Sequence, residues 1–400
     1  MTYKSAYNFD SVVDRAGTRS IKWSHSNASL TAAQAAAKPI PMWLADMDFS
    51  SAPAVIGALH EAVSSGIFGY SADPSESFLQ AVAGWQWRRF GWEIEHDWIV
   101  PAASVIAALK TSIQAFTRPG DSVLIQPPVY VHFHNDVLIN GRHLAPAPLE
   151  FDGSRYSFDP VRFERAIKNN TKIFILCNPH NPTGNVWSED ELRQMGEICA
   201  RHQVLVISDE IHCDFVIGEG RKHIPFASLG QEFALNSVTC TSASKTFNLA
   251  GLQCASMIVP DRFKRDELRR VLERNTNARV NMLGALATEA AYDHGEAWVD
   301  NLVGYISANQ AHFRDSVNSS TSRVKVLEMD SLYLAWIDCR ELGLSIDELD
   351  NFLLTRAKVW FDRGPKFGVE GHGFMRANLA CPRSVVDRSI LQLVHAIESM

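Results

Sequence analysis

The sequence predicts an α/β protein in which helices cover both faces of a mostly parallel central sheet, with a smaller α+β unit attached. Its 400 residues exceed the usual size of one compact core. The middle of the chain alternates short, continuous apolar runs with amphipathic stretches, which is typical of strands buried on both faces. Beyond about residue 261 the pattern becomes helical and then includes two more strand-like pieces, as in a separate α+β unit.

In chain order, the first 40 residues are polar and poorly periodic, and an alanine-rich piece at 31–37 predicts an extended arm or a short helix. The predicted strands of the large sheet share a continuous apolar run; they are 122–126, 172–177, 204–208, 237–240 and 255–259. An amphipathic helix is predicted over about 188–201, between the second and third of these strands.

The rest of the chain predicts one more helix and then the smaller unit. A solvated helix over 261–274 is followed by strands at 324–327 and 332–337 and by a long helix at 385–399. We therefore expect three parts: an N-terminal arm (1–48) that joins the small domain, a large ligand-binding domain (49–290) and a small C-terminal domain (291–400).

Composition argues against several classes of protein. Charged residues make up 21% of the chain and the net charge is −7, which gives no basic surface for nucleic acid or for an anionic membrane. No apolar run approaches the roughly 20 residues of a membrane span, and the N-terminal stretch lacks the apolar core of a signal peptide. The seven cysteines show no CxxC spacing, so we expect reduced thiols in a cytoplasmic protein and no metal site.

Polar clusters directly follow three of the predicted strands. They are NPHNPTG at 178–184, DEIH at 209–212 and TSASK at 241–245. Ligands of open α/β sheets bind beyond the carboxyl ends of the strands. The three clusters together therefore predict one functional site at this edge.

Lys245 and Asp209 suggest the chemistry of that site. A lysine amine becomes nucleophilic when burial lowers its pKa, and a position beside Ser242 and Ser244 suits an imine with an aldehyde whose phosphate the serines hold. Asp209 ends an apolar strand, where a carboxylate needs a partner such as a protonated pyridine nitrogen. Pyridoxal 5′-phosphate (PLP) carries these groups. The alternatives are a surface lysine and an aspartate that caps a helix.

Five further positions fit such a cofactor or an amino-acid substrate. Asn181 can present an amide to the phenolate oxygen, unless its segment is a plain turn. Ser104 and Val105 precede a helical run, and a helix N-terminus binds anions. Tyr130 can stack on a ring or pack in the core. Arg376 can bind a carboxylate through two parallel hydrogen bonds or form a structural ion pair.

In this order and spacing, NPHNPTG, SDEIH, SASKTFNLAGLQ and GFMRAN resemble the fold-type I PLP enzymes, the aminotransferase class I/II superfamily. The resemblance extends from about residue 9 to the C-terminus. PMWLADMDF at 41–49, GIFGY at 66–70, His212 and Gln253 are similar to the cystathionine β-lyase (C–S lyase) branch, because many aminotransferases have tyrosine and arginine at the last two positions.

The resemblance implies a role for each motif residue. Lys245 would hold PLP as an imine and later move the α-proton of the substrate, and Asp209 would pair with the pyridine nitrogen. The other residues implied at the cofactor are Asn181 and His212 at the phenolate, Tyr130 on the ring, Ser104, Val105 and Ser242 at the phosphate and, across a homodimer interface, Tyr70. Those implied at the substrate are Arg376 and Asn181, with Trp43 and Asp46 at the entrance.

The implied reaction is α,β-elimination from an L-cysteine S-conjugate, which yields a thiol, pyruvate and ammonia. The alternative is an aminotransferase or another biosynthetic PLP enzyme that acts on a larger amino-acid conjugate, and a regulatory protein that keeps the fold is a third hypothesis. Ser24, Ser331 and Leu332 depart from the branch, and 101–104 lacks its usual glycine. The departures at Ser331 and Leu332 leave the identity of the substrate open.

Overall fold

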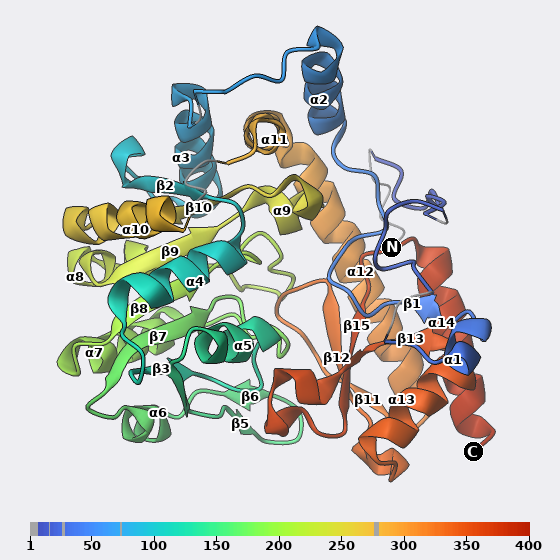
Figure 1. Ribbon diagram of the computed structural model, residues 1–400. Coiled ribbons are helices and arrows are strands. Elements are labelled where there is room, and N and C mark those ends of the chain that lie inside the picture. Colours follow the sequence, from blue (N-terminus) through green and yellow to red (C-terminus); the bar gives the residue numbers. More distant parts are fainter. Residues whose placement is uncertain (1–6, 16, 26–28, 73, 276–279) are drawn as a thin grey trace.

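A seven-stranded sheet forms the centre of the computed structural model (Figure 1), which describes residues 7–15, 17–25, 29–72, 74–275 and 280–400. Parts of the predicted arm, 1–6, 16 and 26–28, lie outside these ranges. The strand order is β2 (Ile99–Ala102), β10 (Ala255–Ile258), β9 (Ser237–Thr241), β8 (Leu205–Asp209), β7 (Thr171–Cys177), β3 (Ser122–Ile125) and β4 (His143–Pro146). The pairings of β10 with β2 and with β9 are antiparallel, and the other pairings in this sheet are parallel. The prediction of a mostly parallel sheet is confirmed.

The five strands predicted from apolar runs all form, each within one residue of its predicted ends. Every residue of β3, β8, β9 and β10 is buried. Burial on both faces explains why these segments show no alternation of apolar and polar residues.

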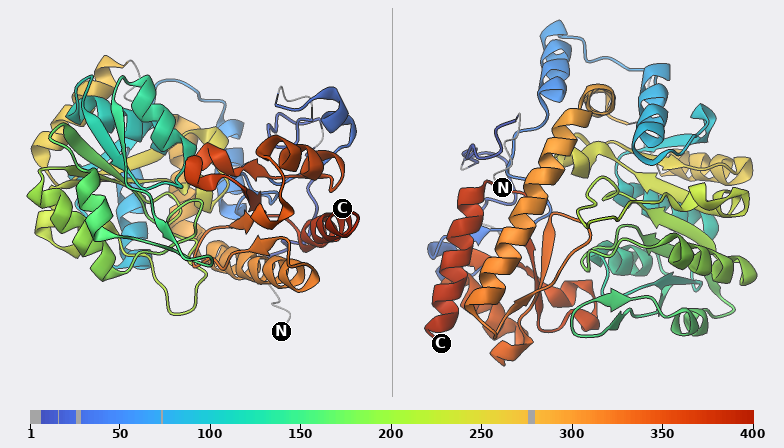
Figure 2. Two further views of the ribbon diagram at one scale, coloured as in Figure 1. Left: turned by 90° about the horizontal axis from the view of Figure 1, so that it is seen from below. Right: turned by 180° about the vertical axis from the view of Figure 1, so that it is seen from behind.

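Helices cover both faces of this sheet, as Figure 2 shows. On one face, α4 (Val105–Phe116), α5 (Val131–Ile139) and α10 (Arg262–Arg274) share an apolar cluster with the strands. A second cluster contains residues of α3 (Glu76–Phe90), α7 (Glu189–Arg201) and α11 (Met282–His294). The predicted helix at 188–201 is α7, and Ser188 and Glu191 close a capping box at its start.

The remaining short elements of this part connect the strands and helices. They are α2 (Pro53–Ser65), β5 (Glu150–Phe151), β6 (Tyr156–Ser157), α6 (Pro160–Ala166), α8 (Gln231–Leu235) and α9 (Ala243–Thr246). Among the described residues, no helix is long and apolar enough to cross a membrane.

A second sheet of four strands lies beside the first (Figures 1 and 2). Its order is β11 (Lys325–Val326), β12 (Leu334–Asp338), β15 (Phe374–Asn378) and β14 (Asp362–Arg363), and all its pairings are antiparallel. A separate apolar cluster joins it to α12 (Glu296–Ser320), α13 (Ile346–Thr355) and α14 (Arg383–Glu398). This cluster supports the expected α+β unit, whose predicted residue boundaries stay a prediction.

The N-terminal arm contacts this second unit. The alanine-rich piece forms the short helix α1 (Ala32–Ala36), capped by Thr31, and α1 packs against α13. Strand β1 (Ile40–Pro41) then pairs in parallel with β13 (Val359–Trp360). The arm therefore contacts the small unit before the chain enters the large one.

One predicted strand begins later than expected. The apolar run at 332–337 predicts a strand from Leu332, but β12 starts at Leu334. Leu332 has a φ of 76°, outside the extended region that a strand requires. The apolar pattern reports the burial of Leu332, which is complete, and does not report its backbone conformation.

Candidate active site

The parallel register brings the three polar clusters together. Cys177 pairs with Asp209, and Asp209 pairs with Cys240, so β7, β8 and β9 end side by side. The segments that follow them border a cavity of about 340 Å³. The predicted site residues that line it are Trp43, Ser104, Val105, Tyr130, Asn181, Asp209, His212, Lys245 and Arg376.

Lys245 lies in the short helix α9, directly after β9. Its Nζ donates a hydrogen bond of 2.7 Å to the carbonyl oxygen of Ala45. Burial lowers the pKa of this amine to about 8, although Asp46 opposes the shift and Arg376 adds to it. A larger fraction of the amine is therefore neutral than on the surface, as imine formation requires.

Asp209 is the last residue of β8 and is buried. Its side chain accepts one hydrogen bond, from the Ile211 N–H at 3.2 Å. This contact is the local backbone cap that the alternative interpretation of Asp209 predicted. No ion pair between described side chains includes Asp209. Burial therefore raises the pKa of its carboxyl to about 7, which the Ile211 N–H counteracts. A buried carboxylate without a cationic partner is suited to accept a charged N–H from a ligand.

Arg376 on β15 is held by protein groups on two sides. Its guanidinium donates to Asn181 Oδ1 at 3.0 Å and to Trp43 O at 3.2 Å, and it pairs with Asp362 Oδ2 at 2.9 Å. Arg376 therefore does form the structural ion pair that was the alternative to binding a carboxylate. Its buried Nε has no partner among the described residues, and the residue faces the cavity.

His212 and Tyr130 complete the walls near the lysine. Burial lowers the pKa of His212 well below its usual value, so the ring is neutral, and its buried Nδ1 has no partner among the described groups. Burial raises the pKa of the Tyr130 hydroxyl, which keeps that group protonated.

The start of α4 borders the cavity and has the geometry that suits an anion. Ser104 is its N-cap and accepts a hydrogen bond from the Ala107 N–H at 3.1 Å. The N–H groups of Val105 and Ile106 belong to the first turn, where no intrahelical acceptor exists, and both residues line the cavity. No residue of 101–104 has a positive φ, so this turn does not require the glycine that is usual in the branch.

Three predicted site residues do not line the cavity. Ser242 donates to Cys254 O at 2.6 Å and accepts from the Ser244 N–H, and Ser244 lines the cavity instead. Asp46 pairs with Arg15. Tyr70 lies away from the cavity and is fully exposed. The roles of Ser242, Asp46 and Tyr70 stay predictions.

The two departures near the expected substrate site lie outside the cavity lining. Ser331 is buried and donates to Gly184 O at 2.9 Å. Leu332 is buried, and its N–H donates to Phe215 O at 2.8 Å. Both residues are therefore bonded to backbone carbonyls outside the cavity lining.

The cavity lining includes residues that sequence reasoning missed, among them His132, Asp362 and Lys366. Asp362 binds both Arg376 and Lys366. The four-residue spacing of Asp362 and Lys366 was visible in the sequence as a possible local ion pair. No sequence signal linked it to the distant Arg376.

Comparison with known proteins decides the family. The model of the aminotransferase class I and II family matches residues 42–393. The chain belongs to this family. It is 41% identical to cystathionine beta-lyase PatB from Bacillus subtilis (strain 168), covering 98% of this chain and 100% of that protein.

Two solved structures are similar over nearly the whole chain. Cystalysin from Treponema denticola, which contains PLP, shares 31% identity with a TM-score of 0.93, covering 98% of this chain and 99% of the other. The PLP-bound C–S lyase from Staphylococcus hominis shares 29% identity with a TM-score of 0.89, covering 98% of each chain. These values confirm the predicted resemblance and fold.

We expect Asp209→Asn to stabilise the cofactor-free protein at high pH. A carboxyl whose folded-state pKa is raised favours folding below its ordinary value of 3.8 and loses that contribution as pH rises to about 7. The difference in free energy of unfolding between Asp209→Asn and the unmodified protein should therefore grow over this window. Urea unfolding at several pH values measures it, and a difference that does not change with pH would contradict the buried, unpaired carboxylate.

Proposed function

We propose that this protein is a PLP-dependent C–S β-lyase that cleaves an L-cysteine S-conjugate by α,β-elimination. The observation that carries the proposal is one cavity that joins the amine of Lys245, the unpaired carboxylate of Asp209 and the start of α4. The similarity to cystathionine beta-lyase PatB and to two PLP-containing structures supports the same conclusion.

The residues present fit this cofactor. Asp209 would accept the hydrogen bond of the ring nitrogen, and the orphaned Nδ1 of His212 together with Asn181 would face the phenolate oxygen. Tyr130 would cover the ring, and the first N–H groups of α4 with Ser104 would bind the phosphate. We also propose that Ser242 acts at the phosphate indirectly: its hydroxyl accepts a hydrogen bond from the Ser244 N–H and so positions Ser244 at that end of the cavity.

Bound PLP supplies an electron sink that stabilises negative charge at the substrate Cα. The protein supplies orientation and proton transfer. Lys245, with its pKa lowered to about 8, removes the α-proton as a general base. Arg376 and Asn181 would hold the α-carboxylate, and Trp43 with Asp46 would border the entrance. The Cβ–S bond then breaks, and the thiol leaves with a proton. The remaining three-carbon enamine rearranges to an imine, and water hydrolyses this imine to pyruvate and ammonia.

An aminotransferase is the second candidate, because the matched family is named for that activity. The two reactions share the α-proton step and differ in the fate of the substrate after that proton is removed. An S-alkyl-L-cysteine separates them: the lyase forms pyruvate and thiol without any keto acid, whereas an aminotransferase needs a keto-acid acceptor.

We expect pyruvate to form from S-methyl-L-cysteine in the absence of an acceptor. Lactate dehydrogenase with NADH reports pyruvate, and a thiol reagent reports methanethiol. Lys245→Ala is the control and should form neither product. Turnover that appears only after a keto acid is added would favour the aminotransferase.

Arg376→Lys tests the carboxylate-binding role. Lysine keeps a positive charge beside Asp362 but cannot form two parallel hydrogen bonds. We expect kcat/KM to fall roughly 30- to 150-fold, which corresponds to a loss of about 2–3 kcal/mol of transition-state stabilisation.

Steady-state kinetics and a melting curve distinguish this role from a structural ion pair. Arg340→Lys is a matched control, because Arg340 forms a two-point contact with Asp338 outside the cavity. If Arg376→Lys lowers Tm and leaves kcat/KM of the folded protein unchanged, Arg376 does not bind substrate.

We further propose that the protein is a homodimer in the cytoplasm. Exposed apolar side chains on α2 and the following loop support a dimer interface there; they are Ile56, Val63, Ile67 and Phe68. Tyr70 follows them and is fully exposed, so it is free to reach a second subunit. The seven cysteines form no disulfide, as expected in a reducing compartment.

Mixing two inactive variants tests the shared site. A heterodimer of Lys245→Ala and Tyr70→Phe chains would contain one site with both residues intact, so activity should return after the subunits are exchanged. Lys245→Ala mixed with Lys245→Arg is the control and should stay inactive. Full activity in a monomer, measured by sedimentation, would contradict the proposal.

A further inference from the structure

The carbonyl oxygen of Ala45 is the acceptor for the amine of Lys245. Its distance from Lys245 Nζ is 2.7 Å, and the Tyr333 hydroxyl also donates to it at 3.3 Å. Ala45 is the central residue of a γ-turn, because the Asp46 N–H donates to Leu44 O at 2.9 Å. The direction of the Ala45 carbonyl therefore depends on how this three-residue turn is fixed.

Buried side chains hold the carbonyls on both sides of Ala45. Asn378 Nδ2 donates to Leu44 O at 2.7 Å and to Asp46 O at 2.8 Å. Lys22 Nζ also donates to Asp46 O, at 2.9 Å. With both flanking carbonyls bound, the Ala45 carbonyl is the one of the three left to face Lys245.

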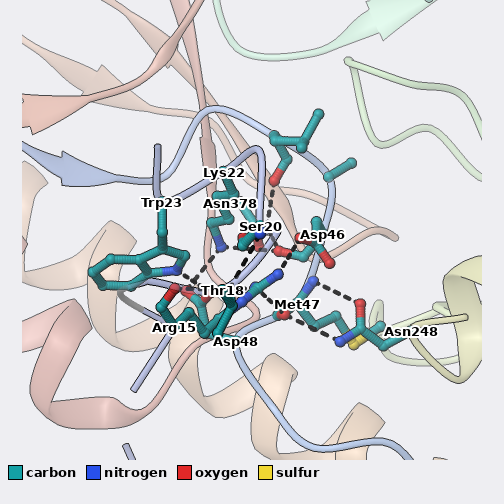
Figure 3. A network of polar contacts seen from close by, with 12 residues as sticks. Arg15, Thr18, Ser20, Lys22, Trp23, Asp46, Met47, Asp48, Asn248 and Asn378 are labelled. Carbon is teal, nitrogen blue, oxygen red and sulfur yellow. Dashed lines mark hydrogen bonds and ion pairs between the residues drawn. The ribbon is translucent and has the colours of Figure 1, made fainter. Parts of the chain in front are cut away.

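A cluster of charged side chains in the N-terminal arm contacts Asp46 and the residues that follow it (Figure 3). Asp48 accepts from Lys22 Nζ at 2.8 Å, from Arg15 at 2.9 Å and from Trp23 Nε1 at 2.8 Å. Arg15 also donates to Met47 O at 2.8 Å. Lys22 has no exposed surface. A buried ion pair contributes little net stability, so stability alone does not account for this cluster.

The same segment is tied to the chain that carries the lysine. Asn248, three residues after Lys245, accepts from the Met47 N–H at 3.0 Å and donates to Met47 O and Phe49 O, both at 3.1 Å. The turn, the lysine and β15 are thus fixed relative to one another through side chains that do not line the cavity.

We propose that Lys22 and Asn378 are positioning residues for Lys245: by fixing the γ-turn, they aim the Ala45 carbonyl at the lysine amine. The inference rests on the part of the proposed function in which Lys245 carries PLP and moves the α-proton. A free lysine side chain has many rotamers, and a fixed acceptor restricts them. Misplacement of a reacting group by about 1 Å can cost roughly 100-fold in rate.

Lys22→Met tests this role, because methionine fills a similar volume without a donor. Arg265→Met is the matched control: Arg265 is also buried and binds two carbonyls and Asp97, but at the start of α10 and away from the cavity. Both variants lose a buried cation, so both should lose stability. Only Lys22→Met should disturb Lys245.

Two measurements on folded protein report the lysine itself. The first is the rate at which cofactor-free protein captures PLP, followed by the imine absorbance at roughly 420 nm. The second is exchange of the L-alanine α-proton in D₂O, followed by NMR on the PLP-loaded protein, which involves no leaving group. For Lys22→Met we expect slower capture and a maximal exchange rate about 10- to 100-fold lower, with a half-saturating alanine concentration within about 3-fold.

Wild-type capture and exchange rates in folded Lys22→Met would overturn the inference, as would equal losses in Arg265→Met. If Lys22→Met does not fold, Trp23→Phe tests the same step, because it removes one hydrogen bond to Asp48 and keeps an aromatic ring, although a smaller one. A smaller loss of capture and exchange in the same direction supports the role, and no loss overturns it. If the unmodified protein captures no PLP on Lys245, the proposed function itself fails. That result differs from one in which the unmodified protein captures PLP and Lys22→Met behaves like it, which overturns only the positioning role.

Discussion

The parallel pairing of β7, β8 and β9 is the constraint on which the site depends. Its register aligns Cys177, Asp209 and Cys240, so three chain segments turn at one edge of the sheet. The backbone groups within these strands bond to one another, and the side chains that come after them are therefore free to face a ligand. A shift of one residue in this register would turn Asp209 to the other face of the sheet.

Burial at this edge disfavours the charged forms of two ionisable groups, so their pKa values move in opposite directions. It raises the pKa of Asp209 to about 7 and lowers the pKa of Lys245 to about 8. Each shift means that the charged form is less stable than in water. A ligand that brings a positive N–H to the carboxylate and an aldehyde to the amine removes both penalties. The site is therefore suited to such a ligand, and binding it would stabilise the fold.

The sequence predicted the sheet well because burial on both faces leaves a direct trace. Continuous apolar runs located β3, β7, β8, β9 and β10. Strand direction leaves no such trace, so the antiparallel orientation of β10 was not predictable from its own residues. The late start of β12 was not predictable either, because a buried leucine at a positive φ has the same apolar character as a buried leucine in a strand.

The site was predictable where its residues follow strand ends in short motifs. Four residues named from such motifs line the cavity, namely Asn181, Asp209, His212 and Lys245. The predicted phosphate residue Ser242 does not line it, whereas Ser244 does. These serines lie two positions apart, and only the local backbone decides which one faces inward. Asp362 was missed because its partner Arg376 comes from another strand, and Lys366 was missed because it reaches the site through its ion pair with Asp362.

The contacts that fix the γ-turn are the feature of the site that is hardest to predict from sequence. Lys22 and Asn378 are separated by more than 350 positions, yet both donate to the carbonyl of Asp46. Nothing in either residue's neighbourhood indicates a shared acceptor. Their common effect is on a backbone oxygen, and a backbone oxygen has no residue identity that a sequence pattern could reveal. The arm and β15 therefore act on Lys245 through geometry alone, which explains why residues outside the cavity can determine the direction of its amine.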